Sequence, residues 1–332
     1  MDKTFQEEFT QIIKFEPPLY KQRHQFVKDL VEKYKPKKVA DLGCADCSLL
    51  WMLKFCSCIE VLAGLDICAN VMKEKMHTLS PLPVDYLQPS ERSLTVTLHH
   101  GSVAHKDPCM LGFDLVTCIE LIEHLDESEL KKFPEVVFGF MAPSIVVIST
   151  PNSEFNPLLS RVMSYRHPDH KFEWSQAQFR NWALEAARCY GYSVEFTGVG
   201  HPPTGMEKVG FCTQIGVFLR KYPQTGELVQ SEKPTETVYK TLLFKTVKSK
   251  ENTWKKINKN KTPQHNLKNP PTSKKECRIL NCMNQNSLHA KNICNSVLDG
   301  IHGGKLKKNQ CAQHLAKLLL CCDTLLALFH LS

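Results

Sequence analysis

Hydrophobic and polar residues alternate along the first 220 positions in a pattern that predicts helices and strands in turn. Residues 20–35 carry apolar side chains at helical spacing and are followed by Pro36, which predicts an amphipathic helix ending there. Helical spacing recurs at 48–55, 71–77 and 177–190. The short apolar runs that predict strands cover residues 37–43, 61–67, 94–100, 113–119, 144–149, 192–199 and 212–219.

Strands that alternate with helices predict a mostly parallel sheet with helices on both faces. The last two strands are joined by about a dozen residues rich in Gly and Pro, which is too short for a helical crossover, so this pair is expected to be antiparallel. A seven-stranded, mostly parallel sheet with an antiparallel terminal pair resembles the class I (Rossmann-like) methyltransferase fold of the α/β class.

The pattern fails after residue 221, and the charge changes with it. Residues 1–219 hold 22 Lys+Arg against 27 Asp+Glu, whereas residues 220–332 hold 20 against 7. Ten lysines and one acid lie between 245 and 275, a composition that cannot bury enough apolar surface to fold. We therefore predict a methyltransferase domain at 13–221 and a basic, largely disordered low-complexity tail at 222–332, with a possible helix near its end.

Composition excludes several classes of protein. Fifteen cysteines in 332 residues are too few for a disulfide scaffold, and the polar, acidic first residues do not resemble a secretory signal, so reduced thiols and a cytoplasmic protein are expected. The most apolar stretch, 315–332, is interrupted by Lys317 and Asp323. It is too short and too charged for a membrane helix, and no membrane partner is expected.

A nucleoside-cofactor site is predicted where the first two strands end. Asp41 and Gly43 lie at the turn from the first strand into the next helix, where glycine lets a ligand approach the backbone. Asp66 ends the second strand, at the position of a carboxylate that binds ribose hydroxyls. Ser102 follows the third strand, where an adenine contact is expected. The single glycine disfavours NAD and suits S-adenosyl-L-methionine, which has no pyrophosphate; a plain tight turn is the alternative.

A metal site is predicted after the fourth strand. Glu120, Glu123 and His124 would share one face of a helical turn at the carboxyl edge of the sheet, and a divalent cation would relieve the repulsion of their carboxylates. A fourth ligand could come from residues 169–174. Carboxylate and imidazole ligands favour Mg²⁺ or Mn²⁺ over a structural Zn²⁺ site. The alternative is an acidic, solvated helix start.

Together these motifs resemble the small RNA 2′-O-methyltransferases, of the short animal type that acts on piRNAs. The resemblance covers about residues 13–220 and rests on the segments FEPPLYKQR (15–23), DLGCADCSLL (41–50), CIELIEHLD (118–126), STPNSEFN (149–156) and DHKFEW (169–174). It implies that Glu120, Glu123, His124 and His170 bind one Mg²⁺ or Mn²⁺ and act in catalysis through that metal. The family usually has glycine at the position of Ala45.

The resemblance implies methyl transfer from S-adenosyl-L-methionine to the 2′-OH of the 3′-terminal nucleotide of small single-stranded RNAs, which protects the 3′ end. It further implies an Argonaute or PIWI-type protein that presents the RNA, a monomeric enzyme, and a place in cytoplasmic RNA-processing granules. Two alternatives remain: an O-methyltransferase of small vicinal diols, and a non-catalytic RNA-binding adaptor whose cofactor affinity is lost through Ala45. Other interpretations treat His167 as an ordinary loop histidine, and Arg166 as part of an RNA path or a solvated face.

Overall fold

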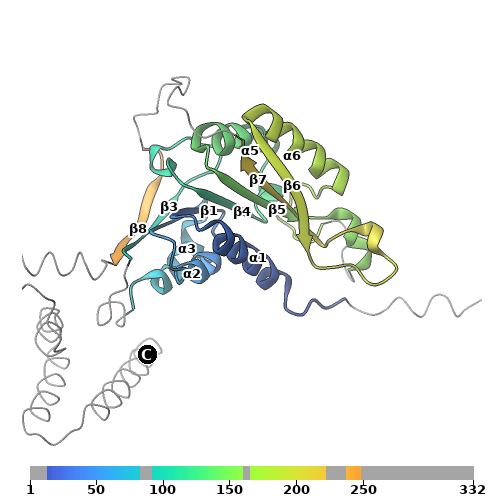
Figure 1. Cartoon of the computed structure of the whole chain (residues 1–332), viewed down its shortest axis with the longest axis horizontal. Helices are drawn as coiled ribbons and strands as arrows, with labels where there is room; N and C mark the ends of the chain where they lie inside the picture. Colours follow the sequence, from blue (N-terminus) through green and yellow to red (C-terminus); the bar gives the residue numbers. More distant parts are fainter. Residues whose placement is uncertain (1–12, 83–91, 160–164, 222–236, 248–332) are drawn as a thin grey trace, which may run out of the picture. The chain divides into compact units, whose positions relative to one another are not determined.

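The computed structural model describes residues 13–82, 92–159, 165–221 and 237–247. All of them belong to one compact unit, residues 1–260; a second unit, 261–332, lies outside the described residues. The described part holds an eight-stranded sheet in the order β6-β7-β5-β4-β1-β2-β3-β8 (Figure 1). The strands are β1 Lys38–Leu42, β2 Val61–Asp66, β3 Leu94–His100, β4 Leu115–Ile119, β5 Ile145–Pro151, β6 Tyr192–Val199, β7 Thr213–Arg220 and β8 Lys240–Val247.

The five central strands β3, β2, β1, β4 and β5 are parallel, and three antiparallel strands flank them. β7 pairs antiparallel with β5, β6 pairs antiparallel with β7, and β8 pairs antiparallel with β3. The predicted α/β class and the antiparallel terminal pair are confirmed. The strand order reverses at β1: β2 and β3 follow on one side of it, and β4 and β5 lie on the other. Open α/β sheets bind their ligands at such a reversal, at the carboxyl ends of the strands, which here is between β1 and β4.

The strand β8 corrects the prediction of seven strands and of a methyltransferase body that ends at residue 221. It pairs with β3 from Leu94↔Val247 to His100↔Lys240, with an irregularity between Leu98 and His99. Its segment, KTLLFKTV, buries only Leu243 fully and carries lysines, as edge strands commonly do to avoid pairing with other chains. Such a strand has a weak hydrophobic signal, and a lysine-rich stretch follows it. The predicted helix near the end of the tail lies outside the described residues.

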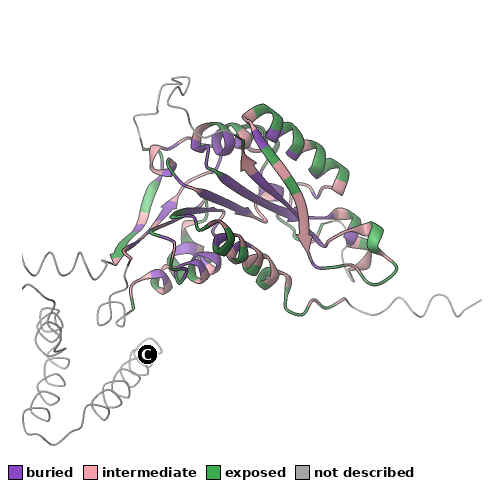
Figure 2. Cartoon of the chain, viewed as in Figure 1, coloured by how far each residue is buried: buried purple, intermediate pink, exposed green. Residues whose placement is uncertain are grey.

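Helices cover both faces of the sheet, and each face has its own apolar core (Figures 1 and 2). α1, α2 and α3 lie on one face, and α5 and α6 on the other. The α-helices are α1 Leu19–Tyr34, α2 Ser48–Leu53, α3 Ala69–Lys75, α5 Glu127–Pro134 and α6 Gln176–Tyr190. Shorter turns are η2 Met76–Leu79, η3 Pro108–Met110, η4 Ile122–His124, η6 Ser153–Leu158 and η7 Glu207–Val209, and the π-helix is η5 Glu135–Met141.

The sequence pattern does not predict α5 or the π-helix η5 that continues it. Pro134 interrupts this segment, and proline disfavours a helix interior because it lacks an N–H and clashes with the preceding turn. The helix forms nevertheless because Asp126 and Glu129 make a reciprocal capping box at its start. Fully buried Phe133 then packs into the sheet core. The helix cap and the burial of Phe133 thus outweigh the unfavourable effect of Pro134 on the helix.

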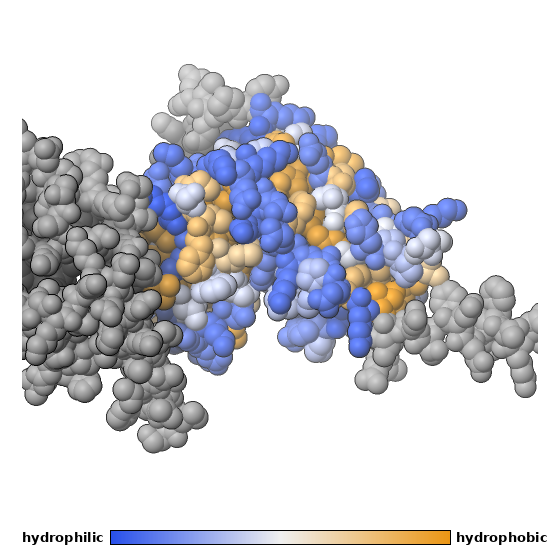
Figure 3. Space-filling model, turned by 60° about the horizontal axis from the view of Figure 1, so that its bottom comes forward, coloured by the Kyte–Doolittle hydropathy of each residue, from blue (hydrophilic) through white to orange (hydrophobic). Residues whose placement is uncertain are grey.

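The face that carries α1, α2 and α3 is mixed in polarity, with apolar areas between hydrophilic ones (Figure 3). A groove of about 400 Å³ on this face is bordered by residues of α1 and by the end of α2. It exposes Trp51 and Phe55, whose rings meet edge to face with centroids 5.3 Å apart.

Among the described residues, no helix is both long and apolar enough to cross a bilayer.

Neighbouring residues of β8 provide a test of its place in the sheet. Leu243 is 8% exposed and packs in the core with α1 and α2, whereas Phe244 is 67% exposed. We expect Leu243→Ala in the full chain to lower the free energy of unfolding by about 2–3 kcal/mol, and Phe244→Ala by less than about 0.5 kcal/mol. Urea denaturation measures both. Equal small effects would show that β8 is not part of the folded sheet.

Candidate active site at the carboxyl edge of the sheet

The turn between β1 and α2 has an unusual backbone conformation. Gly43, Ala45 and Cys47 have φ of 74°, 42° and 63°. Only the first is a glycine, so the other two adopt the left-handed region at a cost. A Cβ at Gly43 would lie 2.8 Å from Cδ1 of Leu121, which follows β4. The absence of a side chain at Gly43 therefore lets the cofactor turn lie directly against the loop that carries the predicted metal ligands.

Asp66 lies at the end of β2, where the sequence places it, and both of its oxygens are held. Its Oδ2 accepts the N–H of Ala45 at 2.8 Å, and its Oδ1 accepts the N–H of Cys68 at 2.7 Å. These contacts fix the carboxylate beside the turn. Ser102 lies after β3 as predicted, but its hydroxyl donates to Oε1 of Glu129 at 3.0 Å. Its role toward a cofactor stays a prediction.

Asp41 is buried in the sheet rather than open at the turn, with 3% of its surface exposed. The hydroxyl of Thr117 on β4 donates to its Oδ1 at 2.7 Å. Burial raises the pKa of Asp41 to about 7, and the hydrogen bond from Thr117 opposes this shift. The carboxyl is therefore poised to lose a proton near neutral pH when a positive charge comes close.

Glu120 lies directly after β4 in a left-handed conformation, with φ of 52°. Contacts with Ser149 and Arg23 hold it there. Its N–H donates to the carbonyl and to the hydroxyl oxygen of Ser149 on β5, and the Ser149 hydroxyl donates to its Oε1 at 2.9 Å. Arg23 of α1 lies 3.3 Å from its Oε2. A strained residue that is fixed by its surroundings in this way is typical of a functional site.

Glu123 is fully buried, and one of its carboxylate oxygens has no hydrogen-bond partner. Oε2 accepts the hydroxyl of Thr150 at 2.9 Å, while Oε1 is the unpaired atom. Burial raises the pKa of Glu123 well above its usual range, and the neighbouring Glu120 raises it further. An unpaired buried acceptor costs free energy, so this oxygen calls for a cation or a donor.

Three imidazoles, one from η4 and two from the loop before α6, come together. His124, His167 and His170 offer ring nitrogens that lie within 4.8 Å of one another, and they form the group that meets this limit among the described residues. Burial lowers the pKa of His124, and its two histidine neighbours lower it further, so its ring is neutral and able to bind a metal. Of the four predicted ligands, this group contains His124 and His170 but neither Glu120 nor Glu123, and it contains the exposed His167, which the prediction leaves out.

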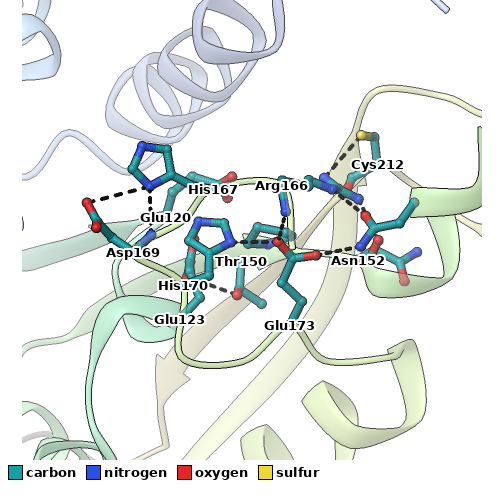
Figure 4. A network of polar contacts seen from close by, with 12 residues as sticks. Glu120, Glu123, Thr150, Asn152, Arg166, His167, Asp169, His170, Glu173 and Cys212 are labelled. Atoms are coloured by element: carbon teal, nitrogen blue, oxygen red, sulfur yellow. Dashed lines mark hydrogen bonds and ion pairs between the residues drawn. The ribbon is translucent and has the colours of Figure 1, made fainter. Parts of the chain in front are cut away.

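A hydrogen-bond network orients His170 and the loop that carries it (Figure 4). Oε1 of Glu173 lies 2.6 Å from Nδ1 of His170 and also accepts the N–H of Arg166, while Oε2 accepts the amide of Asn156. Although burial opposes it, the hydrogen bonds from Asn156 and Arg166 lower the pKa of Glu173. An ionised Glu173 holds the Nδ1 proton of His170, which leaves Nε2 free as a ligand.

The guanidinium of Arg166 serves this network and is not a freely solvated side chain, whereas its place on an RNA path stays a prediction. It donates to Oδ1 of Asn156 and to the carbonyls of Asn152 and Cys212. The loop is also fastened to the metal-ligand turn, because the N–H of Lys171 donates to the carbonyl of Glu123 at 2.7 Å. Arg166 is therefore a structural part of the site.

The donor set fits a divalent cation. Glu123 offers a buried oxygen with no partner, and His170 offers a nitrogen whose opposite ring position is already held. The ion pair with Arg23 occupies Glu120 in this structure. Arg23, Ser149, Thr150 and Glu173 are contributors that the site prediction omits. All four lie within the sequence segments that carry the family resemblance, so those segments were the available signal.

Cys44 and Cys47 of the turn do not form a redox centre. Both thiols are buried, with 5% and 0% of their surfaces exposed. A hydrogen bond with Cys47 and burial raise the pKa of Cys44 well above its usual value. Low thiolate content makes the Cys44 thiol unreactive, and burial restricts access to both cysteines.

The sheet order and the turn after β1 define a class I methyltransferase fold. The chain is 78% identical over 248 residues to the small RNA 2′-O-methyltransferase of Gallus gallus, covering 74% of this chain and 66% of that protein. It is 38% identical over 219 residues to the Drosophila melanogaster protein of the same name, covering 63% and 56%. The crystal structure of the small RNA methyltransferase HEN1 is 30% identical with a TM-score of 0.60, over 72% of this chain and 28% of that one.

The methyltransferase domain of a bacterial Hen1 is 34% identical, with a TM-score of 0.51, and the match covers 60% of this chain and 99% of that one. The chain therefore belongs to the small RNA 2′-O-methyltransferase family. No protein-family model matches it. The matched part spans between about half and two thirds of the length of the curated animal relatives.

Asp41 should make stability depend on pH. Its pKa is about 7 in the folded protein against an ordinary value of 3.8, so the folded state keeps a proton that the unfolded state releases. The stability that this retained proton contributes is fully present below pH 3.8 and is lost as the pH rises to about 7. Above pH 7 it no longer changes with pH. Between pH 5 and 7 the free energy of unfolding of the wild type should therefore fall relative to that of Asp41→Asn, by up to about 1.4 kcal/mol per pH unit. Urea denaturation at pH 5, 6, 7 and 8 measures it, and parallel pH profiles would contradict the assignment.

Ala45 carries backbone strain that glycine would relieve. At φ of 42°, Ala45→Gly should raise the free energy of unfolding by about 0.5–1 kcal/mol, because glycine enters the left-handed region freely. The matched control is Ala186→Gly in the interior of α6, which should lower it by about 1 kcal/mol. Thermal and urea denaturation distinguish the two. A loss of stability at both positions would show that Ala45 is not strained.

Proposed function

We propose that this protein transfers a methyl group from S-adenosyl-L-methionine to the 2′-OH of the 3′-terminal nucleotide of small single-stranded RNAs, with help from a divalent cation. Family membership supports methylation of small RNA, and the geometry of the site supports the rest of the proposal. The observation that carries it is the contact between the cofactor turn and the ligand turn. Gly43 of the cofactor turn lies against Leu121, a residue that stands between Glu120 and Glu123 in the sequence. A methyl donor bound at the cofactor turn would therefore face a hydroxyl bound at the ligand turn.

The cofactor would lie along the ends of β1, β2 and β3. Asp66, held by two backbone N–H groups, would accept the ribose hydroxyls, and the turn at Gly43 would let the cofactor approach the backbone. Asp41 would lose its proton as the positively charged cofactor comes near. The segment at Ser102 would form the adenine side. We assign Asp41, Gly43, Asp66 and Ser102 as cofactor-binding residues on these grounds.

Glu120, Glu123, His124 and His170 would hold the cation, Mg²⁺ or Mn²⁺. The unpaired buried oxygen of Glu123 and the clustered ring nitrogens of His124 and His170 support this, and the exposed His167 belongs to the same cluster of histidines. When bound, such a cation lowers the pKa of a coordinated hydroxyl and fixes its orientation. The protein's own part is positioning. Glu173 keeps His170 in the ligating tautomer, Thr150 fixes one oxygen of Glu123, and Ser149 fixes Glu120. Holding donor and acceptor in line supplies much of the rate enhancement.

The substrate class follows from chelation. A terminal ribose with free 2′ and 3′ hydroxyls offers two adjacent oxygens to one cation, whereas a 2′-deoxy or 3′-phosphate end does not. We extend the proposal, on the family resemblance alone, to piRNA-like substrates, an Argonaute or PIWI-type presenting protein, a monomeric enzyme and a cytoplasmic site in RNA-processing granules. A small diol such as a catechol offers the same two oxygens and is the competing substrate.

The test mixes the full chain with tritiated S-adenosyl-L-methionine, Mn²⁺ and a ~28-nucleotide single-stranded RNA that varies only in its terminal ribose. Label should enter the 2′,3′-diol end and not the 2′-deoxy or 3′-phosphate ends. Glu123→Gln should lower the rate about 100-fold or more, because it removes a charged ligand while it keeps the side-chain volume. Exposed His77→Ala, in η2, is the control and should keep the rate.

The other outcomes select the alternatives. Transfer to a catechol without transfer to RNA would identify a small-diol enzyme. RNA binding without heat on titration with S-adenosyl-L-methionine would identify a non-catalytic adaptor. Equal rates for Glu123→Gln and the wild type would show that the carboxylate is not a ligand.

A further inference from the structure

Tyr239, just before β8, packs onto the segment that follows β3. The residue is 8% exposed, and its hydroxyl shares its one proton between the carbonyl oxygens of Ser102 and His105, which lie 3.0 and 2.5 Å away. Its ring lies directly over Gly101, where a Cβ would overlap the ring carbons. One buried tyrosine therefore fixes both ends of the turn at 102–105, which contains the predicted adenine contact.

Asp107 fastens the same segment to β8 from the other side. It is 1% exposed, and its Oδ2 accepts the N–H groups of Val238 and Tyr239 at 2.6 and 2.8 Å. Its Oδ1 accepts the N–H of Cys109 at 2.9 Å. The carboxylate thus joins the chain before β8 to the loop after β3, and it places the Tyr239 ring.

This junction continues to the predicted ribose carboxylate. The N–H of Gly101 donates to the carbonyl of Asp66 at 3.0 Å, and the side chain of Asp66 accepts the N–H of Ala45. Tyr239 is therefore linked to the cofactor turn by three successive contacts, through Gly101 and Asp66, although it is more than 190 residues distant in sequence. No sequence motif marks it, and it lies in the segment predicted as a disordered tail.

We propose that Tyr239 is a positioning residue of the cofactor site, which makes the segment 237–247 part of the functional methyltransferase body. The inference rests on the proposed cofactor and adds a residue outside the family motifs. Without the hydroxyl, the turn at 102–105 loses its two fixed carbonyls and samples other conformations. Only molecules with an ordered turn then bind the cofactor well, so the apparent affinity falls in proportion to the fraction of molecules in which the turn is ordered.

The competing explanation is that Tyr239 only stabilises the fold. Another buried tyrosine of the chain, Tyr192, serves as a matched control. Tyr192 on β6 is also buried, at 1% exposed, and its hydroxyl also donates to a backbone carbonyl, that of Pro143 at 2.6 Å. β6 is at the opposite edge of the sheet from β8. Tyr192→Phe therefore removes a similar buried hydrogen bond far from the cofactor turn.

The experiment titrates the full chain with S-adenosyl-L-homocysteine, the demethylated product of the cofactor, by calorimetry. Tyr239→Phe should weaken binding about three- to tenfold, and Tyr192→Phe should leave it within about twofold of the wild type. With RNA saturating, Tyr239→Phe should raise the KM for S-adenosyl-L-methionine and change kcat little. Hydrogen exchange should speed up at residues 102–109 in Tyr239→Phe and not in Tyr192→Phe.

The outcomes separate this inference from the proposed function. Wild-type protein that binds no S-adenosyl-L-homocysteine would overturn the cofactor assignment, and the inference with it. If the wild type binds and both variants bind equally well, or are weakened equally, the role of Tyr239 is overturned. The proposed function is then unaffected. Tyr239→Phe that weakens binding without faster exchange at 102–109 would overturn the positioning explanation.

Discussion

The fully buried carboxylate of Glu123, with one oxygen bound by Thr150 and the other unpaired, is the constraint on which the site depends. Burial of this group is unfavourable unless something positive or proton-donating completes it. The surrounding chain is arranged to keep it there. The loop before α6 donates the N–H of Lys171 to the Glu123 carbonyl, and the same loop brings His170 beside His124, with ring centroids 4.8 Å apart. In the function we propose, a divalent cation would complete this carboxylate.

The order of the strands makes this arrangement possible. β1 and β4 are neighbours in the sheet but distant in sequence, so the cofactor turn and the ligand turn leave the sheet side by side. Each turn contains a left-handed residue that is not glycine, Ala45 in one and Glu120 in the other. The N–H of each donates to a side chain on an adjacent strand, Asp66 on β2 and Ser149 on β5. Strain at the site is thus offset by the rigid sheet beneath it.

The sequence predicts the parts of this structure that have strong local signals. The strands at 94–100 and 192–199 match the structure at both ends, because continuous or alternating apolar residues mark them clearly. α5 is not predicted because Pro134 contradicts its helical pattern, and β8 is not predicted because an edge strand buries one side chain. The hydroxyl contacts of Tyr239, the tautomer of His170 and the approach of His167 depend on pairs of residues that only the fold brings together.

The most direct test of the account is a Mn²⁺ titration of the cofactor-free protein, followed by electron paramagnetic resonance, in the wild type and in Thr150→Val. We expect one Mn²⁺ to bind per chain, and binding to weaken about tenfold in Thr150→Val, because Glu123 loses the hydroxyl that orients it. Binding should be accompanied by proton release, since the raised pKa of Glu123 falls when the cation arrives. No bound Mn²⁺, or binding without proton release and unaffected by Thr150→Val, would contradict the claim that this carboxylate is completed by a metal.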